Sequence, residues 1–314
     1  ASNFASSCRS KAEKKSAKTL YLEGYQQLTE PTAQYNFNAD IKLDGGQFEP
    51  MLANIKLQLN GAVDMAGKQF EVTPEVKAAM FQVKLPMSID LKQEHIVIDP
   101  ADIINAMQMF QPDAASLVER YQNKFVRLKK SSLQLDEEQQ QELETAFDAA
   151  RQIFEIAFDV AEKASQELPE SSFQLQDLGE TKQAEVKTAI SLVLSPEQRK
   201  DFERAMLSQF RERLQQSTIA DEIKAQIIAG LEEAETLDSP NEQVDSIVYL
   251  NDKGQVIRVN DRYTYVIEGK QAFMDVNVAF TQYGQAKFSI APAVADIIDL
   301  DEEEIATVQM LMGK

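Results

Sequence analysis

The sequence is poor in residues on which many active sites depend. It contains one cysteine, Cys8, and one histidine, His95. A single cysteine excludes a disulfide within the chain and a cysteine-rich metal site, and a single histidine restricts any Ser-His-Asp arrangement to His95. Glycine-rich phosphate loops, Walker motifs and dinucleotide fingerprints are absent as well. The sequence therefore predicts a protein without catalysis, metal or cofactor, in which His95 has a structural role.

Basic residues are also scarce. The chain has 32 Lys and Arg residues against 51 Asp and Glu residues, which gives a net charge of −19. Binding to nucleic acid depends on clustered basic side chains, so nucleic acid is not an expected partner. Only the segment around Cys8, with Arg9 and Lys11 among its residues, is basic. We therefore expect attraction to a membrane surface to be confined to the N-terminus.

The third shortage is of long hydrophobic runs. No stretch of about 18 apolar residues is present, so no segment is expected to span a membrane. Residues 1–10 lack periodicity and are predicted to be a disordered tether, followed by one domain at 11–314. Small residues precede Cys8, which resembles the end of a bacterial lipoprotein signal, although Ala5 stands where Leu is usual. Cys8 is thus a candidate lipid anchor, and the alternative is a free thiol.

Strict alternation of apolar and polar residues is what the sequence does contain. Residues 244–292 read as an antiparallel meander with a turn at Gly254, and similar runs cover 35–43, 55–65 and 81–91. Two interruptions are expected to be local irregularities. A bulge or bend is predicted at Asn60-Gly61, and a bulge or strand end at Asp261, which falls on an otherwise apolar face.

Helical patterns occupy two insertions between these strands. A long helix beginning near residue 136 carries an apolar stripe that includes Phe147 and Phe154, and Ser195-Pro196 is a strong start for a second helix. The acidic run 299–304 is interpreted as the first turn of a terminal helix rather than a calcium site, because it lacks the loop glycine and alternating ligand spacing. The fold class is therefore α+β.

The order of elements resembles the LppX/LprG-like and LolA-like lipoproteins of bacterial envelopes. The resemblance rests on the final hairpin, on the strand 81–91 with its central hairpin, and on the segments 280–284 and 288–292. It implies a strongly curved antiparallel sheet, a half-barrel, with helices packed on the concave face and an apolar cavity between them. It also implies an extracytoplasmic, membrane-anchored protein in the periplasm or at the cell surface.

The resemblance further implies binding of a lipid or acyl chain in that cavity. The side chains expected to line it are the apolar residues of the alternating strands and of the long helix, namely Tyr35, Phe37, Ile55, Leu57, Phe81, Val83, Leu85, Met87, Ile89, Phe147, Phe154, Val276, Val278 and Phe280. The alternative is a structural or interaction protein of the envelope, with a filled core, no ligand and a protein partner.

Overall fold

The computed structural model describes residues 15–44, 53–78, 82–110, 115–129, 137–178, 185–236, 243–267 and 270–311. The strands are β1 Gln34–Asp44, β2 Ala53–Asp64, β3 Gln69–Lys77, β4 Gln82–Lys84, β5 Met87–Asp90, β6 His95–Ile98, β7 Phe125–Lys129, β8 Phe173–Gln176, β9 Thr188–Leu192, β10 Gln243–Leu250, β11 Val256–Ile267, β12 Lys270–Thr281 and β13 Ile297–Asp299. The α-helices are α1 Ala17–Thr29, α2 Ala101–Phe110, α3 Ala115–Tyr121, α4 Glu137–Glu167, α5 Pro196–Gln216, α6 Asp221–Thr236 and α7 Glu302–Leu311. Two short 3-10 turns, Glu170–Ser172 and Val294–Asp296, precede β8 and β13.

The described strands all belong to one sheet. Its order is β13-β7-β6-β5-β3-β2-β1-β12-β11-β10-β9-β8, and β4 pairs with β3 beside this path. Pairing is antiparallel except between β13 and β7, which are parallel. The first and last strands of the order do not pair with each other, so the sheet is open. The prediction of an α+β protein built on a large antiparallel sheet is confirmed.

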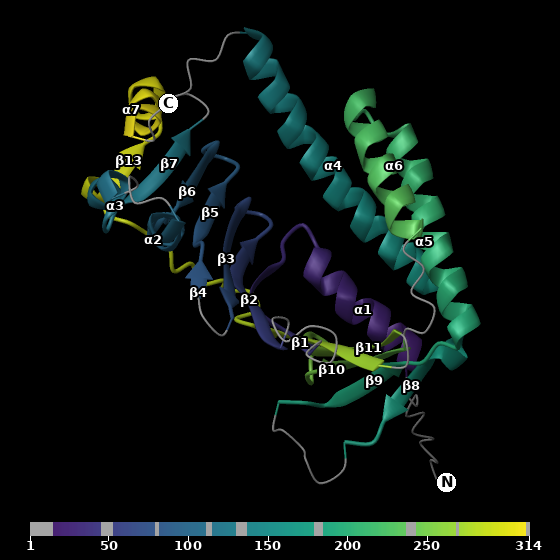
Figure 1. Cartoon of the computed structure of the whole chain (residues 1–314). Helices are drawn as coiled ribbons and strands as arrows, with labels where there is room; N and C mark the ends of the chain where they lie inside the picture. The colour runs from purple at the N-terminus through teal and green to yellow at the C-terminus, as the bar shows by residue number, and fades with distance from the viewer. Residues whose placement is uncertain are drawn as a thin grey trace, which may run out of the picture.

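The helices are divided between two regions of the sheet (Figure 1). Helices α1, α4, α5 and α6 lie together on one side, at the right of the view. Helices α2, α3 and α7 gather near β7 and β13, where Ile104, Leu117 and Tyr121 form a small buried cluster against Val126 and Ile298. Different helices therefore cover the two ends of the sheet: α1 packs on the end with β8 to β11, and α2, α3 and α7 lie at the end with β7 and β13.

The main buried core lies where α1 packs on strands β8 to β11. Leu28 of α1 joins Leu168 and strand residues that include Ile190, Val248 and Leu250 in one apolar cluster, in which every residue is at most 8% exposed. Gly24 allows the helix to approach closely, because a Cβ at this position would lie 3.0 Å from Leu250 Cδ2. The core of the protein is thus displaced toward one half of the sheet.

The helices on the same side form a second packed unit. Ala149 of α4, Leu214 of α5 and Ile219 beside α6 form a buried apolar cluster. The predicted start of α5 is confirmed, because Ser195 accepts a hydrogen bond from Gln198 N at 3.1 Å and its own N–H donates to Gln198 Oε1 at 2.9 Å. This reciprocal capping fixes where the helical pair begins.

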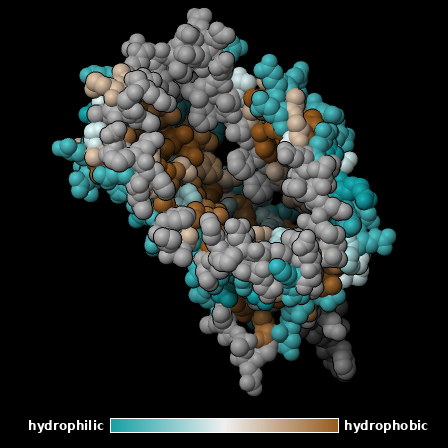
Figure 2. Space-filling model, in the orientation of Figure 1, coloured by the Kyte–Doolittle hydropathy of each residue, from teal (hydrophilic) through white to brown (hydrophobic). Residues whose placement is uncertain are grey.

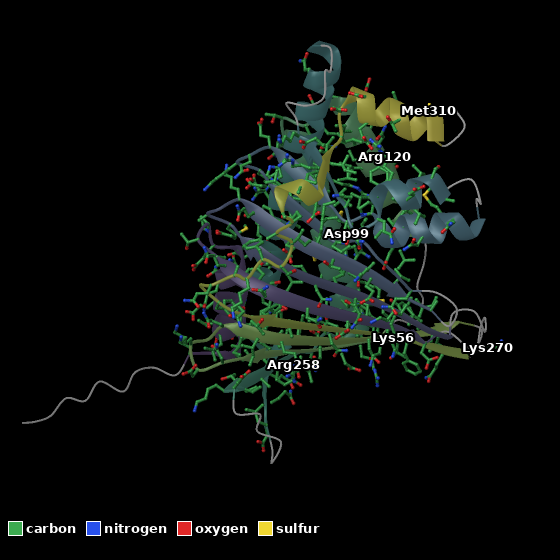
Figure 3. The ribbon with its side chains drawn as sticks, turned by 90° about the vertical axis from the view of Figure 1, so that its left-hand side faces the viewer. Lys56, Asp99, Arg120, Arg258, Lys270 and Met310 are labelled. Atoms are coloured by element: carbon green, nitrogen blue, oxygen red, sulfur yellow. The ribbon has the colours of Figure 1, made fainter. Side chains whose placement is uncertain are left out.

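The face of the sheet that does not carry the α1 core bears mostly polar side chains, Asn36 and Glu71 among them, and is called the polar face. After β12 the chain crosses this face. The Asn36 side chain pairs with the backbone N–H and carbonyl of Lys287, both at 2.8 Å. The Glu71 carboxylate, in a residue only 5% exposed, accepts from Ser289 N at 2.7 Å and Ile290 N at 2.8 Å. Figure 3 looks onto this side of the sheet, and the crossing segment (yellow) runs over the strands. Side-chain hydrogen bonds of the sheet therefore hold the crossing in place.

The crossing ends at the β7 edge, where ion pairs fix the terminal elements. Arg127 donates to both carboxylate oxygens of Asp299, at 2.6 and 2.9 Å. Arg120 Nε donates to Glu304 at 2.7 Å, and this guanidinium holds the pKa of Glu304 below its usual value. Asp301 accepts from Glu304 N at 2.8 Å at the start of α7. The interpretation of the acidic run as a helix start is confirmed.

Two local predictions are wrong. The β1–β2 and β2–β3 registers continue through Asn60 and Gly61 without a shift, and the β11 registers continue through Asp261. Glycine is needed at position 61 for space instead, because a Cβ there would lie 2.2 Å from Glu71 O and 2.5 Å from the Phe37 ring. The backbone of Asp261 pairs regularly with both neighbouring strands, and its side chain lies on the apolar face.

We expect Gly61→Ala to reduce the free energy of unfolding by about 1 to 3 kcal/mol, because the added methyl group collides with the neighbouring backbone and the Phe37 ring. Chemical denaturation measures the change. Gly230→Ala on α6 is the matched control, since nothing lies within 4 Å of its added Cβ, and it should be neutral or stabilising by up to about 1 kcal/mol. Equal effects of the two substitutions would contradict this account.

Candidate functional site

The residues expected to line a cavity are distributed over β1, β2, β4, β5 and β12. In an antiparallel pair, residues that stand directly opposite each other share a face of the sheet. The pairing registers place the following members of the set on one face: Tyr35, Phe37, Ile55, Leu57, Val83, Met87, Ile89, Val276, Val278 and Phe280. Leu85 lies between β4 and β5. The strand members of the predicted site that the structure describes therefore share one surface.

The structure does not describe the side chains of three of the predicted cavity residues or of the predicted anchor Cys8. Cys8 and Phe81 fall outside the described residues. Phe147 and Phe154 belong to α4, and the description does not extend to their side chains. The part of the predicted site that can be placed is consequently the sheet, and the helix contribution stays a prediction.

The strand registers join these side chains into rows that cross the sheet. One row runs through Phe280, Phe37, Gly61, Val72 and Met87. A second row on the same face consists of residues directly paired from β12 to β4, in the order Val276, Ile41, Leu57, Val76 and Val83. Adjacent strands lie about 4.8 Å apart, so the four steps of the second row span roughly 19 Å. The apolar face is thus a continuous surface.

Most of these side chains are half-buried, although Phe280 packs against the cluster beneath α1. Phe37, Ile41, Leu57, Val72 and Met87 fall in the intermediate class of exposure, unlike the cluster beneath α1, in which Ile190, Val248 and Val256 are 0% exposed. In Figure 2 apolar (brown) residues gather where the surface is hollowed between the strands at left and the helices at right. The apolar face therefore keeps a part of its surface that the described residues do not cover.

Asp261 lies on this same face, in the middle of β11. It stands directly opposite Ser246 of β10 and Val276 of β12. Its Oδ1 atom is buried and has no hydrogen-bond partner among the residues that the structure describes. Burial raises the pKa of Asp261, and a hydrogen bond from Ser246 offsets part of this effect. The carboxylate is therefore held where its charged form is poorly solvated.

Two tyrosines of α1 complete the surroundings of this carboxylate. The rings of Tyr21 and Tyr25 lie 4.8 Å apart, and Tyr21 also contacts the Phe173 ring at 5.1 Å. Burial raises the pKa of Tyr21 to about 12 and raises that of Tyr25 well above its usual value, and the charge of Asp261 contributes to both shifts. Both hydroxyls thus stay protonated, and the Tyr25 hydroxyl donates a hydrogen bond to that of Tyr21.

The sequence signal for this feature was present but misread. Asp261 interrupts the apolar positions of β11, which are Val259, Tyr263 and Tyr265 on the same face. An acidic residue at an apolar position favours either a local irregularity or a buried functional group, and sequence pattern alone does not separate the two. The unshifted register excludes a local irregularity at Asp261.

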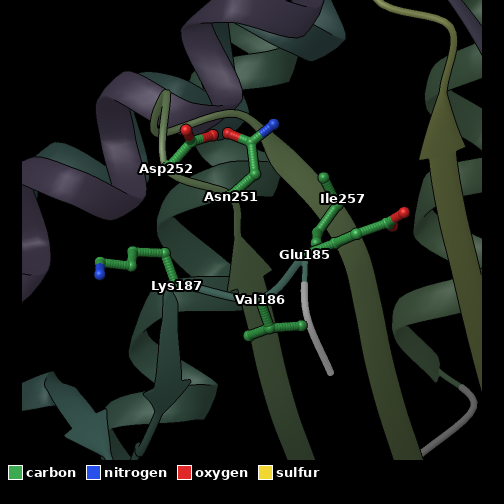
Figure 4. Close-up of a pocket in the computed structure, with 6 residues that line it drawn as sticks. All are labelled: Glu185, Val186, Lys187, Asn251, Asp252 and Ile257. Carbon is green, nitrogen blue, oxygen red and sulfur yellow. The ribbon is translucent and has the colours of Figure 1, made fainter. Parts of the chain in front are cut away.

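Two small surface pockets offer less suitable sites. One, of about 420 Å³, is lined by Glu185, Val186, Lys187, Asn251, Asp252 and Ile257. Figure 4 shows that its charged side chains point apart rather than toward a common centre. The other, of about 440 Å³, is lined by Pro196, Glu197, Lys200, Asp201 and Arg204 of α5, all exposed. Neither pocket has the apolar lining that an acyl chain requires.

Metal chemistry finds no support in the part of the chain that the structure describes. Within it, no three His, Cys, Asp or Glu side chains come together in an arrangement that could hold a metal ion. The described helices also include none that is long and apolar enough to cross a membrane.

The apolar face with Asp261 is the candidate site that the geometry defines best.

Comparisons with known proteins do not assign the chain to a family. No protein-family model matches it, and no curated protein is significantly similar to it. The resemblance to LppX/LprG-like and LolA-like lipoproteins consequently stays a prediction, and the functional argument depends on the residues of this chain alone.

We expect the replacement Asp261→Asn to stabilise the protein relative to wild type at neutral pH and to have less effect in acid. The raised pKa means that ionisation of Asp261 opposes folding. Below the unfolded-state pKa of about 3.9 the carboxyl group is protonated in both states and the penalty is absent. The penalty grows as the pH rises from there and is complete above the folded-state pKa. Denaturant unfolding of both proteins across this range measures it.

The matched control is Asp275→Asn on the polar face. Arg262 lowers the pKa of Asp275, with Nε–Oδ1 and Nη2–Oδ2 distances of 2.6 and 2.9 Å. Its contribution therefore has the opposite sign: stability is gained above the unfolded-state pKa and lost as the pH falls through the folded-state pKa. The same pH trend in both variants would contradict the assignment of Asp261 to a poorly solvated site.

Proposed function

We propose that this protein is a membrane-tethered extracytoplasmic lipoprotein that binds or carries a lipid or acyl chain, without catalysis. The observation that carries the proposal is the continuous apolar face of the sheet, whose central side chains remain half-buried. In a protein with a filled core these side chains would be covered, and large exposed apolar patches usually mark binding sites. A lipid chain is an occupant of matching chemistry.

The dimensions of the face suit this occupant. The row from Val276 to Val83 crosses five strands in register, and its length of roughly 19 Å is on the order of an extended fatty acyl chain. Each methylene group removed from water contributes about 0.8 kcal/mol before the entropic cost of binding is subtracted. Contact along most of the row is thus sufficient for appreciable affinity.

The arrangement of the helices and strands supports a more detailed proposal for the shape of the sheet. We infer that the open sheet forms a curved half-barrel of the LolA-like type, with α1 and α4 to α6 on its concave face. The placement of these helices on one side of the sheet supports this inference (Figure 1). The packing of α1 against strands β8 to β11 supports it also. In this arrangement a ligand lies between the uncovered strands and the helices.

The test of lipid binding uses two replacements by the same residue on opposite faces of β1. Ile41 lies in the apolar row and Lys42 is exposed on the polar face. Placing an unpaired amide against a bound chain costs about 1 to 3 kcal/mol, so Ile41→Gln should weaken binding by roughly 5- to 150-fold. Lys42→Gln should retain wild-type affinity. Titration with a fluorescent fatty acid measures both.

Native mass spectrometry of the purified protein provides the complementary reading. Loss of several hundred daltons on denaturation, roughly the mass of a lipid, would support a bound ligand. A single unchanged mass, together with no uptake from added lipid vesicles and no response to the fluorescent fatty acid, would instead favour the structural or interaction protein with a filled core.

Attachment to the membrane gives a separate prediction. If Cys8 is the lipidated residue, Cys8→Ser should move the protein from the membrane fraction to the aqueous fraction of cells that process lipoproteins, since stable anchoring depends on the attached chains. Ser7→Ala is the matched control and should leave the distribution unchanged. Retention of the Cys8→Ser protein in the membrane fraction would contradict the tether without affecting the lipid-binding proposal.

A further inference from the structure

The apolar face carries a single acidic side chain along its described strands. The residues that the registers place on this face are apolar or uncharged on β1, β2, β3, β10 and the other long strands, apart from Asp261 and from Lys270 at the exposed start of β12. Asp261 is central rather than peripheral, because it lies within β11 and pairs with two neighbouring strands. A carboxylate in this position requires a physical reason.

The polar face shows how this protein treats carboxylates that serve structure alone. Asp275 pairs with Arg262, and Asp299 pairs with Arg127. Glu71 receives backbone N–H groups from the crossing segment. Each of these groups has donors that compensate its charge. Asp261 differs, because among the described residues Ser246 is the one hydrogen-bond donor to its carboxylate, and its buried Oδ1 has no donor there.

Leaving a buried carboxylate oxygen without a partner is unfavourable, and an apolar residue in this position would give a more stable sheet. Such a group is best explained by a partner that is present only when a ligand is bound. The row that contains Asp261 continues through Val276, Ile41 and Leu57. The apolar side chains of Val276, Ile41 and Leu57 therefore extend away from Asp261 across the sheet, where they could contact the chain of a ligand whose polar group is bound at Asp261.

We propose that Asp261 binds the polar end of the ligand, and that this ligand is a lipid whose head group carries an amine. The proposal rests on the lipid-binding function above and deepens it. An ammonium group supplies both the positive charge and the N–H donors that Oδ1 lacks, whereas a carboxylate or phosphate head would be repelled. Tyr21 and Tyr25 lie within electrostatic range of Asp261, since its charge contributes to the raised pKa of both tyrosines.

In the resulting arrangement the head group lies between β11 and α1, and the chain extends across β12, β1 and β2 along the row of Val276, Ile41 and Leu57. Asp261 as a whole is half-buried, so part of the residue is accessible, and binding of the head group requires the covered Oδ1 atom to become accessible to it. Uptake from a membrane would transfer the head group to this carboxylate and the chain to the apolar row.

The experiment compares three amphiphiles with the same chain and different polar ends: dodecylamine, dodecanol and laurate. Calorimetric titration of the wild-type protein should show dodecylamine binding at least about tenfold more tightly than laurate, because a charged hydrogen bond contributes roughly 1.5 to 3 kcal/mol. Asp261→Asn should reduce this ratio to about threefold or less and leave the affinity for dodecanol within about twofold of wild type. Circular dichroism melting verifies that the variant is folded.

Asp275→Asn is the control for general charge attraction, since the chain carries a net charge of −19. It removes one negative charge from the polar face and should leave the preference for the amine unchanged. A measurement on wild type alone adds independent evidence: lowering the pH toward protonation of Asp261 should diminish the amine preference.

The outcomes separate the two proposals. If none of the three amphiphiles binds the wild-type protein, lipid binding itself is refuted. If all three bind with similar affinity, or if Asp261→Asn keeps the amine preference, the apolar face binds chains but Asp261 does not recognise the head group. Loss of the amine preference in both Asp261→Asn and Asp275→Asn would assign it to overall charge and overturn the inference.

Discussion

The register between neighbouring strands is the constraint on which the rest of this structure depends. Because side chains alternate, a shift of one residue in any pair would move the apolar residues of that strand to the polar face. The long pairs β1–β12, β2–β3 and β11–β12 have no shift within their paired residues. Apolar positions far apart in the sequence therefore line up in rows, and Asp261 is fixed on the same face as Val276 and Ile41.

The two faces created by this register are used differently. The polar face binds part of the chain itself, since Asn36 and Glu71 hold the crossing segment by hydrogen bonds to backbone groups. The apolar face is covered by helix α1 in one half, where Leu28 and Val248 belong to a buried cluster. In the other half the strand side chains stay half-buried. The asymmetry between the halves is what distinguishes a candidate binding surface from an ordinary core.

Sequence periodicity predicted much of this arrangement, because strands with one apolar face and helices with clear caps leave strong local signals. The meander of β10 to β12 and the Ser195 cap of α5 are examples. Strand β3 is less evident, since Pro74 interrupts it and the polar Glu71 becomes buried only through contacts with Ser289 and Ile290, more than two hundred positions along the chain. Such contacts have no local signal.

The same limit explains why Gly61 and Asp261 were misread. In isolation, a glycine or an aspartate within an alternating run indicates a break. The true reasons lie on other strands: the Phe37 ring occupies the space above Gly61, and the paired strands hold Asp261 in register. Alternation in a sequence predicts which side chains of a strand face the core. The neighbouring strands determine why a residue such as Gly61 or Asp261 departs from that alternation. At Gly61 the exception is steric, whereas at Asp261 it leaves a buried Oδ1 for which the described residues provide no hydrogen-bond donor.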